Sequence, residues 1–219
     1  MIRVIIADDH PLVRAGLKHV LDECADMELA DEVDNGNDLI TRVRQAKFDV
    51  VLLDMVMPGR NGIELIKQLK HEFPKLPIIV LSTHKEDMFA LRTIKAGVSG
   101  YLCKDYAADS LVQAIRKVAD GGMFISPSVA ELLAKDLHAP TQQEDLPHKL
   151  LTDREYQIFL LVAERLGSTD IANRLNLSIK TVSTHKARIK QKMQIGNDSD
   201  FVLYALKHHL VGDSDAASL

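Results

Sequence analysis

The stretch Val50–Asp54, which reads VVLLD, decides the fold of this chain. Its apolar residues follow one another without alternation, which is typical of a strand buried on both faces of a parallel sheet. The residues that follow, MVMPG, include a proline and a glycine and do not continue a strand. We therefore expect Asp54 at the carboxyl end of a buried strand, the edge where open α/β sheets bind their ligands.

The rest of residues 1–120 repeats this alternation of apolar strands and amphipathic helical stretches. Five such βα units predict a doubly wound α/β fold with a five-stranded parallel sheet. The expected strands cover 2–7, 27–33, 48–54, 77–81 and 100–103. The first expected helix begins at residue 11. The other four cover 37–46, 61–71, 85–96 and 107–119.

Carboxylates gather at the predicted carboxyl edge of this sheet. Asp8 and Asp9 directly follow the first strand, and Asp54 ends the third. Like charges raise one another's pKa values unless a cation lies among them. Oxygen ligands at a water-accessible edge suit Mg²⁺, which we expect Asp9 and Asp54 to hold.

Two more strands end in polar side chains, at Ser82-Thr83 and at Lys104. Together with the carboxylates, these groups suit phosphoryl transfer to an aspartate, with Asp54 as the nucleophile. Lys104 would place a fixed positive charge beside the phosphoryl oxygens, and Ser82 would donate a hydrogen bond to them.

Residues 1–120 resemble the receiver domain of bacterial two-component response regulators. The resemblance rests on Asp8-Asp9, LDMVMPGRNG at 53–62, VLSTH at 80–84 and AGVSGYLCK at 96–104. It implies a flavodoxin-like fold and phosphorylation of Asp54 by a partner histidine kinase. It also implies Mg²⁺ ligation by Asp9, Asp54 and the carbonyl of Val56, with Asp8 just behind these ligands.

The same resemblance implies a pair of switch residues. Ser82 would be the hydroxyl that contacts the phosphoryl group, and the spacing to Gly97 and Lys104 favours Ser82 over Thr83. Tyr101 is either the aromatic residue that turns inward together with Ser82 or a strand aromatic that simply packs.

Residues 123–149 are expected to form a linker. Ser126-Pro127 can start a short helix, because proline is favoured at the first helical position. Val129, Leu132 and Leu133 would give this helix one apolar face. Residues 136–149, DLHAPTQQEDLPHK, are polar, contain two prolines and have no period, which predicts a flexible tether.

Residues 150–210 read as helical throughout. Thr152 and Glu155 predict a capping box at the start of the first helix. Ser168 would cap a short helix over 169–175, and Ser178, after a tight turn, would cap a longer helix over 179–193. Two helices joined by so short a turn predict a helix-turn-helix, whose second helix enters the major groove of DNA.

The second of these helices carries five lysine and arginine residues and no acid. Small polar residues on it would allow close approach to the bases, while lysine and arginine bind phosphate or guanine. The predicted DNA contacts are Lys180, Thr181, Ser183, Thr184, Ala187, Arg188 and Lys192.

The segments LTDRE at 151–155, DIA at 170–172 and LSIKTVSTH at 177–185 resemble the LuxR-type DNA-binding domain. With the receiver, the whole chain resembles a NarL/FixJ-class response regulator. The resemblance implies a four-helix domain whose last helix, about 199–209, pairs two subunits on an inverted DNA repeat. The apolar stripe of that helix is either this pairing surface or entirely core; it comprises Phe201, Val202, Tyr204, Ala205 and Leu206.

The expected organisation is therefore a receiver domain over 1–122, a linker over 123–149, a helix-turn-helix domain over 150–210 and a tail over 211–219. Charge is unevenly divided: residues 1–122 hold 16 Lys and Arg against 19 Asp and Glu, whereas residues 150–210 hold 9 against 6. A basic module beside an acidic one is a weak indication that the second module meets a polyanion.

The composition, 46% hydrophobic and 26% charged, is that of a soluble globular protein. No apolar run is long enough for a transmembrane helix, and the first residues show no signal-peptide pattern. Cys24 and Cys103, two thiols in predicted core segments, favour a reducing compartment. We expect a cytoplasmic bacterial protein.

The leading hypothesis is a DNA-binding transcriptional regulator that is switched by phosphorylation of Asp54 and dimeric when phosphorylated. It would be no enzyme beyond catalysing its own phosphorylation and dephosphorylation. The alternative is a phosphorylation-independent DNA-binding regulator whose receiver serves as a dimerisation module. A phosphatase with Asp54 as nucleophile is disfavoured. The pattern that such enzymes resemble has a second aspartate two residues after the nucleophile, which acts as general acid. This chain has Val56 there, which cannot donate a proton.

Overall fold

The computed structural model describes residues 1–55, 57, 62–82, 88–104, 107–138, 146–208 and 210–211. The chain divides into two compact units, Met1–Leu132 and Leu133–Leu219. The boundary falls inside helix α6, Pro127–His138, which is the helix predicted for the linker. None of the helices in the described ranges combines the length and the apolar character needed to cross a membrane.

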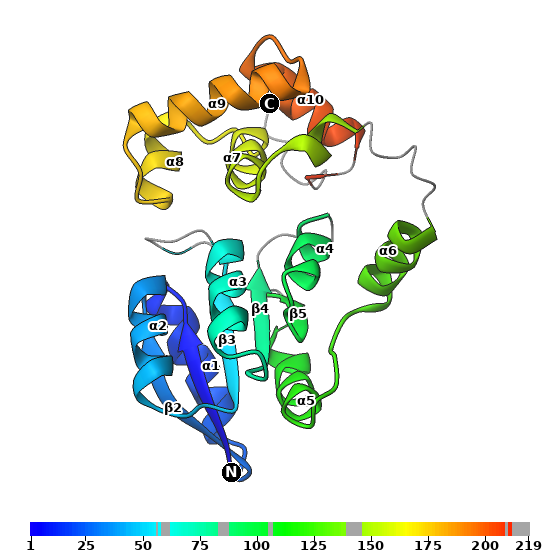
Figure 1. Cartoon of the computed structure of the whole chain (residues 1–219). Coiled ribbons are helices and arrows are strands. Elements are labelled where there is room, and N and C mark those ends of the chain that lie inside the picture. The colour runs from blue at the N-terminus through cyan, green and yellow to red at the C-terminus, as the bar shows by residue number, and fades with distance from the viewer. Residues whose placement is uncertain are drawn as a thin grey trace. The chain divides into compact units, whose positions relative to one another are not determined.

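The first unit is built on a five-stranded parallel sheet in the order β2-β1-β3-β4-β5 (Figure 1). Its strands are β1 Ile2–Ala7, β2 Met27–Val33, β3 Val50–Asp54, β4 Ile78–Ser82 and β5 Gly100–Cys103. β3 is the central strand, and every residue of it is buried. The unalternated apolar run is therefore a strand buried on both faces, as predicted, and it lies in the middle of the sheet.

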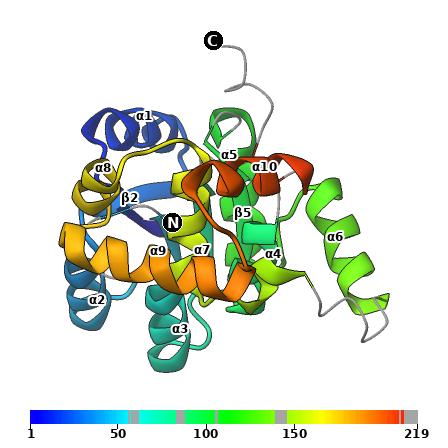
Figure 2. The same ribbon diagram turned by 90° about the horizontal axis from the view of Figure 1, so that it is seen from above.

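Helices cover both faces of this sheet (Figure 2). One face carries α1, Pro11–Asp22, and α5, Ala107–Ala119. The other carries α2, Gly36–Gln45, α3, Gly62–Glu72, and α4, Met88–Lys95. The doubly wound fold is confirmed, with element bounds mostly within two residues of those predicted, and residues 85–87 of the predicted fourth helix lie outside the described residues.

The core of this unit forms between the apolar sides of the helices and the buried strands. Apolar residues three or four positions apart, such as Leu17 and Leu21 of α1 and Leu111 and Ile115 of α5, pack on the strands. The strand register then aligns the carboxyl ends. Ala7 lies opposite Leu53, Asp54 opposite Leu81, and Ser82 opposite Cys103.

The second unit is helical. It contains the 3₁₀ helix η2, Pro147–Leu150, and the helices α7 Asp153–Ala163, α8 Ser168–Arg174, α9 Ile179–Met193 and α10 Asp198–Lys207. Phe159 of α7 and Phe201 of α10 are fully buried, with their ring centroids 5.9 Å apart. Burial of Ile171, Val182 and Ile189 joins α8 and α9 to the same core.

The predicted caps are confirmed at two of three helix starts. Thr152 and Glu155 form the capping box of α7, and the Ser178 side chain accepts a hydrogen bond from Thr181 N at 3.0 Å. The predicted cap at Ser168 is wrong. α8 begins one residue earlier, with Gly167 as its N-cap, and the hydroxyl of Ser168 instead accepts a hydrogen bond from Lys186 Nζ at 3.3 Å.

The tether predicted for 136–149 is partly wrong. α6 continues to His138, and Pro147 begins η2, because proline suits the first position of a helical turn. The side chain of His148 is buried, and its Nδ1 lies 2.8 Å from the hydroxyl of Tyr204. This distant partner gives local order to a sequence that has no period. Residues 139–145 lie outside the described residues.

Candidate phosphorylation site and nucleic-acid interface

Lys104 connects two buried carboxylates at the carboxyl edge of the sheet. Its Nζ donates to Asp54 Oδ2 at 2.9 Å and lies 2.8 Å from Asp8 Oδ2. Burial alone would lower the pKa of Lys104, but the negative charges of Asp54 and Asp8 outweigh burial and raise that pKa. The lysine therefore stays charged and neutralises part of the negative charge around Asp54.

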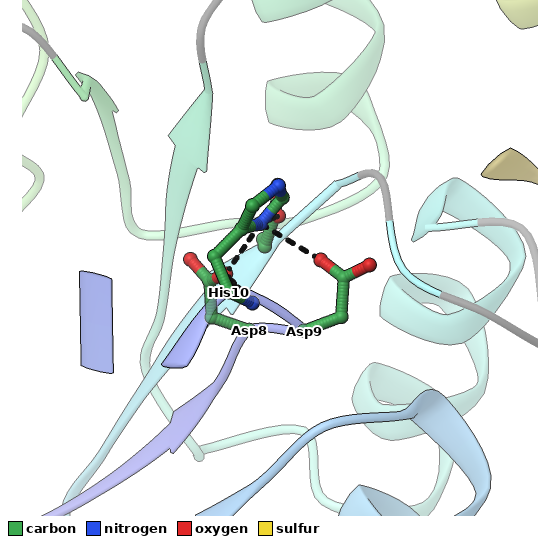
Figure 3. Close-up of side chains that lie close together, drawn as sticks. Asp8, Asp9 and His10 are labelled. Atoms are coloured by element: carbon green, nitrogen blue, oxygen red, sulfur yellow. Dashed lines mark hydrogen bonds and ion pairs between the residues drawn. The ribbon is translucent and has the colours of Figure 1, made fainter. Parts of the chain in front are cut away.

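His10 lies beside the carboxylates of Asp8 and Asp9 (Figure 3). Its Nδ1 is 3.0 Å from Asp8 Oδ1, 2.9 Å from Asp9 Oδ1 and 3.7 Å from Asp54 Oδ2. Each of the four residues offers a ligand atom, and these atoms lie within 4.8 Å of one another. Clustered carboxylate oxygens fit a small, hard divalent cation such as Mg²⁺.

Sequence reasoning missed His10, although its position directly after Asp8-Asp9 was a signal. A second contact that was missed belongs to Arg14 on the first turn of α1. Its guanidinium donates to the main-chain oxygen of Asp8 at 2.6 Å. Arg14 therefore holds the turn between β1 and α1 on which both aspartates are carried.

The other predicted receiver residues lie on neighbouring strands. Ser82 ends β4 and is buried, and its carbonyl accepts a hydrogen bond from Lys104 N at 2.7 Å. Tyr101 of β5 is buried as well, a position that both of its predicted roles allow. Val56 and Thr83 lie outside the described residues.

The helix-turn-helix consists of α8, a tight turn and α9. Asn176, with a φ of 50°, takes the left-handed conformation that turns the chain. Val182, Ile189 and Met193 bury one side of α9. The opposite side is exposed to solvent, as predicted; it comprises Lys180, Ser183, Thr184, Ala187 and Arg188.

The structure turns Lys192 away from this exposed stripe. Its Nζ donates to Glu155 Oε2 at 2.6 Å and to the Leu150 carbonyl at 3.3 Å. Gln191, which the sequence reasoning did not single out, is exposed instead, one turn beyond Ala187. Thr181 is only half-exposed, with its hydroxyl 2.8 Å from that of Ser178.

α10 is partly core and partly surface. Phe201 and Ala205 are fully buried, whereas Val202, Tyr204 and Leu206 are half-buried. Leu203, outside the predicted apolar stripe, is 66% exposed. The helix therefore keeps an apolar residue at the surface after its own domain has folded.

Comparison with known proteins agrees with the division of the chain into two units. Residues 4–116 match the response regulator receiver domain, and residues 149–205 match the luxR family of bacterial regulatory proteins. The response regulator GacA of Pseudomonas aeruginosa is 38% identical over 218 residues, which span 100% of both chains.

Solved structures of RcsB are similar over nearly the whole chain. RcsB from Salmonella enterica serovar Typhimurium, bound to promoter DNA with the phosphomimetic BeF3⁻, is 30% identical with a TM-score of 0.64, covering 93% of this chain and 97% of that one. A structure of two RcsB dimers bound to two parallel DNAs is 31% identical with a TM-score of 0.56, covering 94% and 98%. The chain therefore belongs to the NarL/FixJ-class response regulators, which join a receiver domain to a LuxR-type DNA-binding domain.

Proposed function

We propose that Asp54 of this DNA-binding response regulator accepts a phosphoryl group from a partner histidine kinase, and that this transfer controls binding to promoter DNA. The observation that carries the proposal is the buried Asp54 carboxylate, held 2.9 Å from Lys104 beside Asp8 and Asp9. The same chain ends in a domain with an exposed polar stripe on α9.

Each receiver residue has a part in the transfer. A carboxylate oxygen of Asp54 attacks phosphorus while the bond from phosphorus to the kinase histidine breaks. The ammonium of Lys104 stabilises negative charge on the phosphoryl oxygens, and the Ser82 hydroxyl donates a hydrogen bond to one of them. Mg²⁺, when held by Asp9 and Asp54 with the Val56 carbonyl, would neutralise further charge; Asp8 would orient these ligands.

Phosphorylation would act on DNA binding through dimerisation. The exposed Leu203 of α10 supports a second copy of the chain as partner, as in the RcsB dimers on DNA. Such a dimer would place two α9 helices in successive major grooves of an inverted repeat. Because its target is genomic DNA, we place the protein in the bacterial cytoplasm.

The test compares full-length wild type with Asp54→Asn after incubation with acetyl phosphate and Mg²⁺. We expect intact mass to show one added phosphoryl group on wild type and none on the variant. DNA affinity should rise about tenfold or more in wild type alone, within the range of typical coupling energies. Asp22→Asn, an exposed aspartate at the end of α1, serves as the matched control and should behave as wild type.

The contrary outcome is equally specific. If wild type becomes phosphorylated while its DNA affinity and oligomeric state stay unchanged, the phosphoryl switch is refuted. The receiver would then serve as a dimerisation module of a phosphorylation-independent regulator.

A further inference from the structure

His185 lies on α9 at the border between the exposed stripe and the buried side of the helix. Its side chain is half-buried, and its Nδ1 is buried without a hydrogen-bond partner among the described residues. A buried N–H that finds no acceptor is costly, so in the neutral ring the hydrogen belongs on Nε2. The half-exposed ring then has an Nε2–H group to donate.

Two guanidinium groups act on this ring. Arg188 lies three residues later on α9 and is exposed. Arg154 of α7 is held beside the turn of the helix-turn-helix, since it donates to the Gln157 side chain at 2.7 Å and to the Leu175 carbonyl at 3.2 Å. Burial and the charges of Arg154 and Arg188 lower the pKa of His185, so the ring is neutral at neutral pH in the free protein.

One acid also acts on the ring. Glu155 of α7 raises the pKa of His185, but its carboxylate accepts hydrogen bonds from Lys192 Nζ at 2.6 Å and from Thr152 N at 2.8 Å. The charge of Glu155 is therefore already balanced within the domain. Cations that gather at a surface attract an anion, and the anion that a DNA-binding helix meets is the backbone phosphate.

We propose that Arg154, His185 and Arg188 form a site for one phosphate of the DNA backbone, and that His185 takes up a proton when this phosphate binds. The phosphate offsets the two guanidinium charges, which makes the imidazolium stable in the complex. The proton comes from solvent, and the imidazolium pairs with a phosphate oxygen. DNA affinity therefore rises as the pH falls through the range in which histidine titrates. The inference rests on the proposed function, because it assumes that α9 meets DNA.

Other roles of His185 predict a different dependence on pH. A ring that only packs against α7 leaves DNA affinity the same at each pH at which the domain is folded. A neutral ring that donates Nε2–H to a phosphate strengthens binding equally at each pH. A ring that gains a proton on binding makes affinity depend on pH and adds one cation to the interface.

The experiment measures binding of the full-length protein to a mixed-sequence DNA duplex by fluorescence anisotropy between about pH 5.5 and 8. A mixed sequence suffices because phosphate contacts carry no sequence information. We expect wild-type affinity to rise about tenfold toward the lower pH, which corresponds to a difference of about one between the pKa values of the bound and the free ring. His185→Gln keeps an N–H donor but gains no proton, so its affinity should change less than about threefold. His19→Gln, an exposed histidine of α1, is the matched control and should keep the wild-type rise.

Two further readouts follow the proton itself. At the lower pH, the slope of log affinity against log salt should be steeper by about 0.9 in wild type than in His185→Gln, and at the upper pH the slopes should agree. Calorimetry in two buffers of different ionisation enthalpy should show more proton uptake by wild type than by His185→Gln, with circular dichroism as the control for folding. Equal pH profiles or equal proton uptake in wild type and His185→Gln would overturn the site.

Acetyl phosphate tests the proposed function separately. If wild type takes up the proton but its DNA affinity does not respond to acetyl phosphate, the phosphate site stands and the phosphoryl switch fails. If affinity responds to acetyl phosphate but His185→Gln keeps the wild-type pH profile, the switch stands and this site fails.

Discussion

At the scale of single residues, lysines that look alike in the sequence of α9 have different surroundings. Lys180 lies on the exposed stripe, whereas the ammonium of Lys192 lies 2.6 Å from the buried Glu155 carboxylate. An exposed lysine is available to neutralise a phosphate of DNA. A lysine paired with a buried acid stabilises the domain.

Lys180→Gln and Lys192→Gln should therefore separate binding from stability. We expect Lys180→Gln to lower the slope of log affinity against log salt by about 0.9 and to change the free energy of unfolding by less than about 0.5 kcal/mol. Lys192→Gln should leave the salt slope nearly unchanged but cost about 1–3 kcal/mol, because Glu155 loses a partner. Fluorescence anisotropy against salt and urea denaturation measure the two effects, and equal salt slopes in both variants would contradict the assignment.

Glu155 makes the stability of the DNA-binding domain depend on pH. Burial would raise the pKa of Glu155, but hydrogen bonds from Lys192 and Thr152 outweigh burial and lower that pKa below its usual 4.5. The resulting stabilisation is present above the unfolded pKa and is lost as pH falls through the folded pKa. Urea unfolding below about pH 4.5 should show a steeper loss of stability for wild type than for Glu155→Gln. Parallel pH profiles would refute this.

At the scale of elements, the start of α3 is fitted closely against the end of β3. A Cβ on Gly62 would lie 2.9 Å from the main-chain oxygen of Met55 and 2.7 Å from its Cε. Met55 directly follows Asp54, so a side chain at Gly62 would press on the proposed phosphorylation site. The glycine is needed here for close approach.

Gly62→Ala should destabilise the receiver by about 1–3 kcal/mol, as overpacking does, and should slow the phosphorylation of Asp54 by acetyl phosphate. Gly16→Ala on α1 is the matched control. A Cβ at Gly16 meets nothing within 4 Å, so alanine should stabilise that helix by about 0.5–1 kcal/mol. Thermal unfolding and the rate of mass gain measure both effects. If Gly62→Ala is phosphorylated as fast as wild type, the contact between Gly62 and Met55 does not affect Asp54.

At the scale of the whole molecule, the chain holds two compact units, and within the described residues only the first carries a carboxylate cluster of this kind. A ligand that binds the folded form of one unit stabilises that unit. Metal binding should therefore stabilise the unit Met1–Leu132 and have little effect on the stability of Leu133–Leu219.

Calorimetric unfolding with increasing Mg²⁺ provides the test. At a Mg²⁺ concentration a hundredfold above the dissociation constant, the receiver should gain about 2.7 kcal/mol. Asp54→Asn should unfold at a higher temperature than wild type without metal, because one of three clustered carboxylates is gone, and should respond less to Mg²⁺. If Mg²⁺ stabilises wild type and Asp54→Asn equally, the ion binds at another place.

Much of this architecture could be predicted from the sequence because its causes are local or periodic. The apolar run Val50–Asp54 determined a doubly buried strand, and parallel strand ends determined that Asp8, Asp54 and Lys104 would share one edge. The capping box of α7 and the exposed polar side of α9 likewise depend on residues a few positions apart.

Tertiary structure alone decided the contacts between side chains that are distant in the chain. Lys192 reaches Glu155 across 37 positions and so leaves the exposed stripe of α9. His148 reaches Tyr204 across 56 positions and so gives order to a stretch without a pattern. His10 contacts Asp8 and Asp9, its neighbours in the chain, but strand pairing is what places its ring 3.7 Å from Asp54 Oδ2. Helical and strand periods determine which side of an element is buried, but the partner of each polar group depends on how the elements pack.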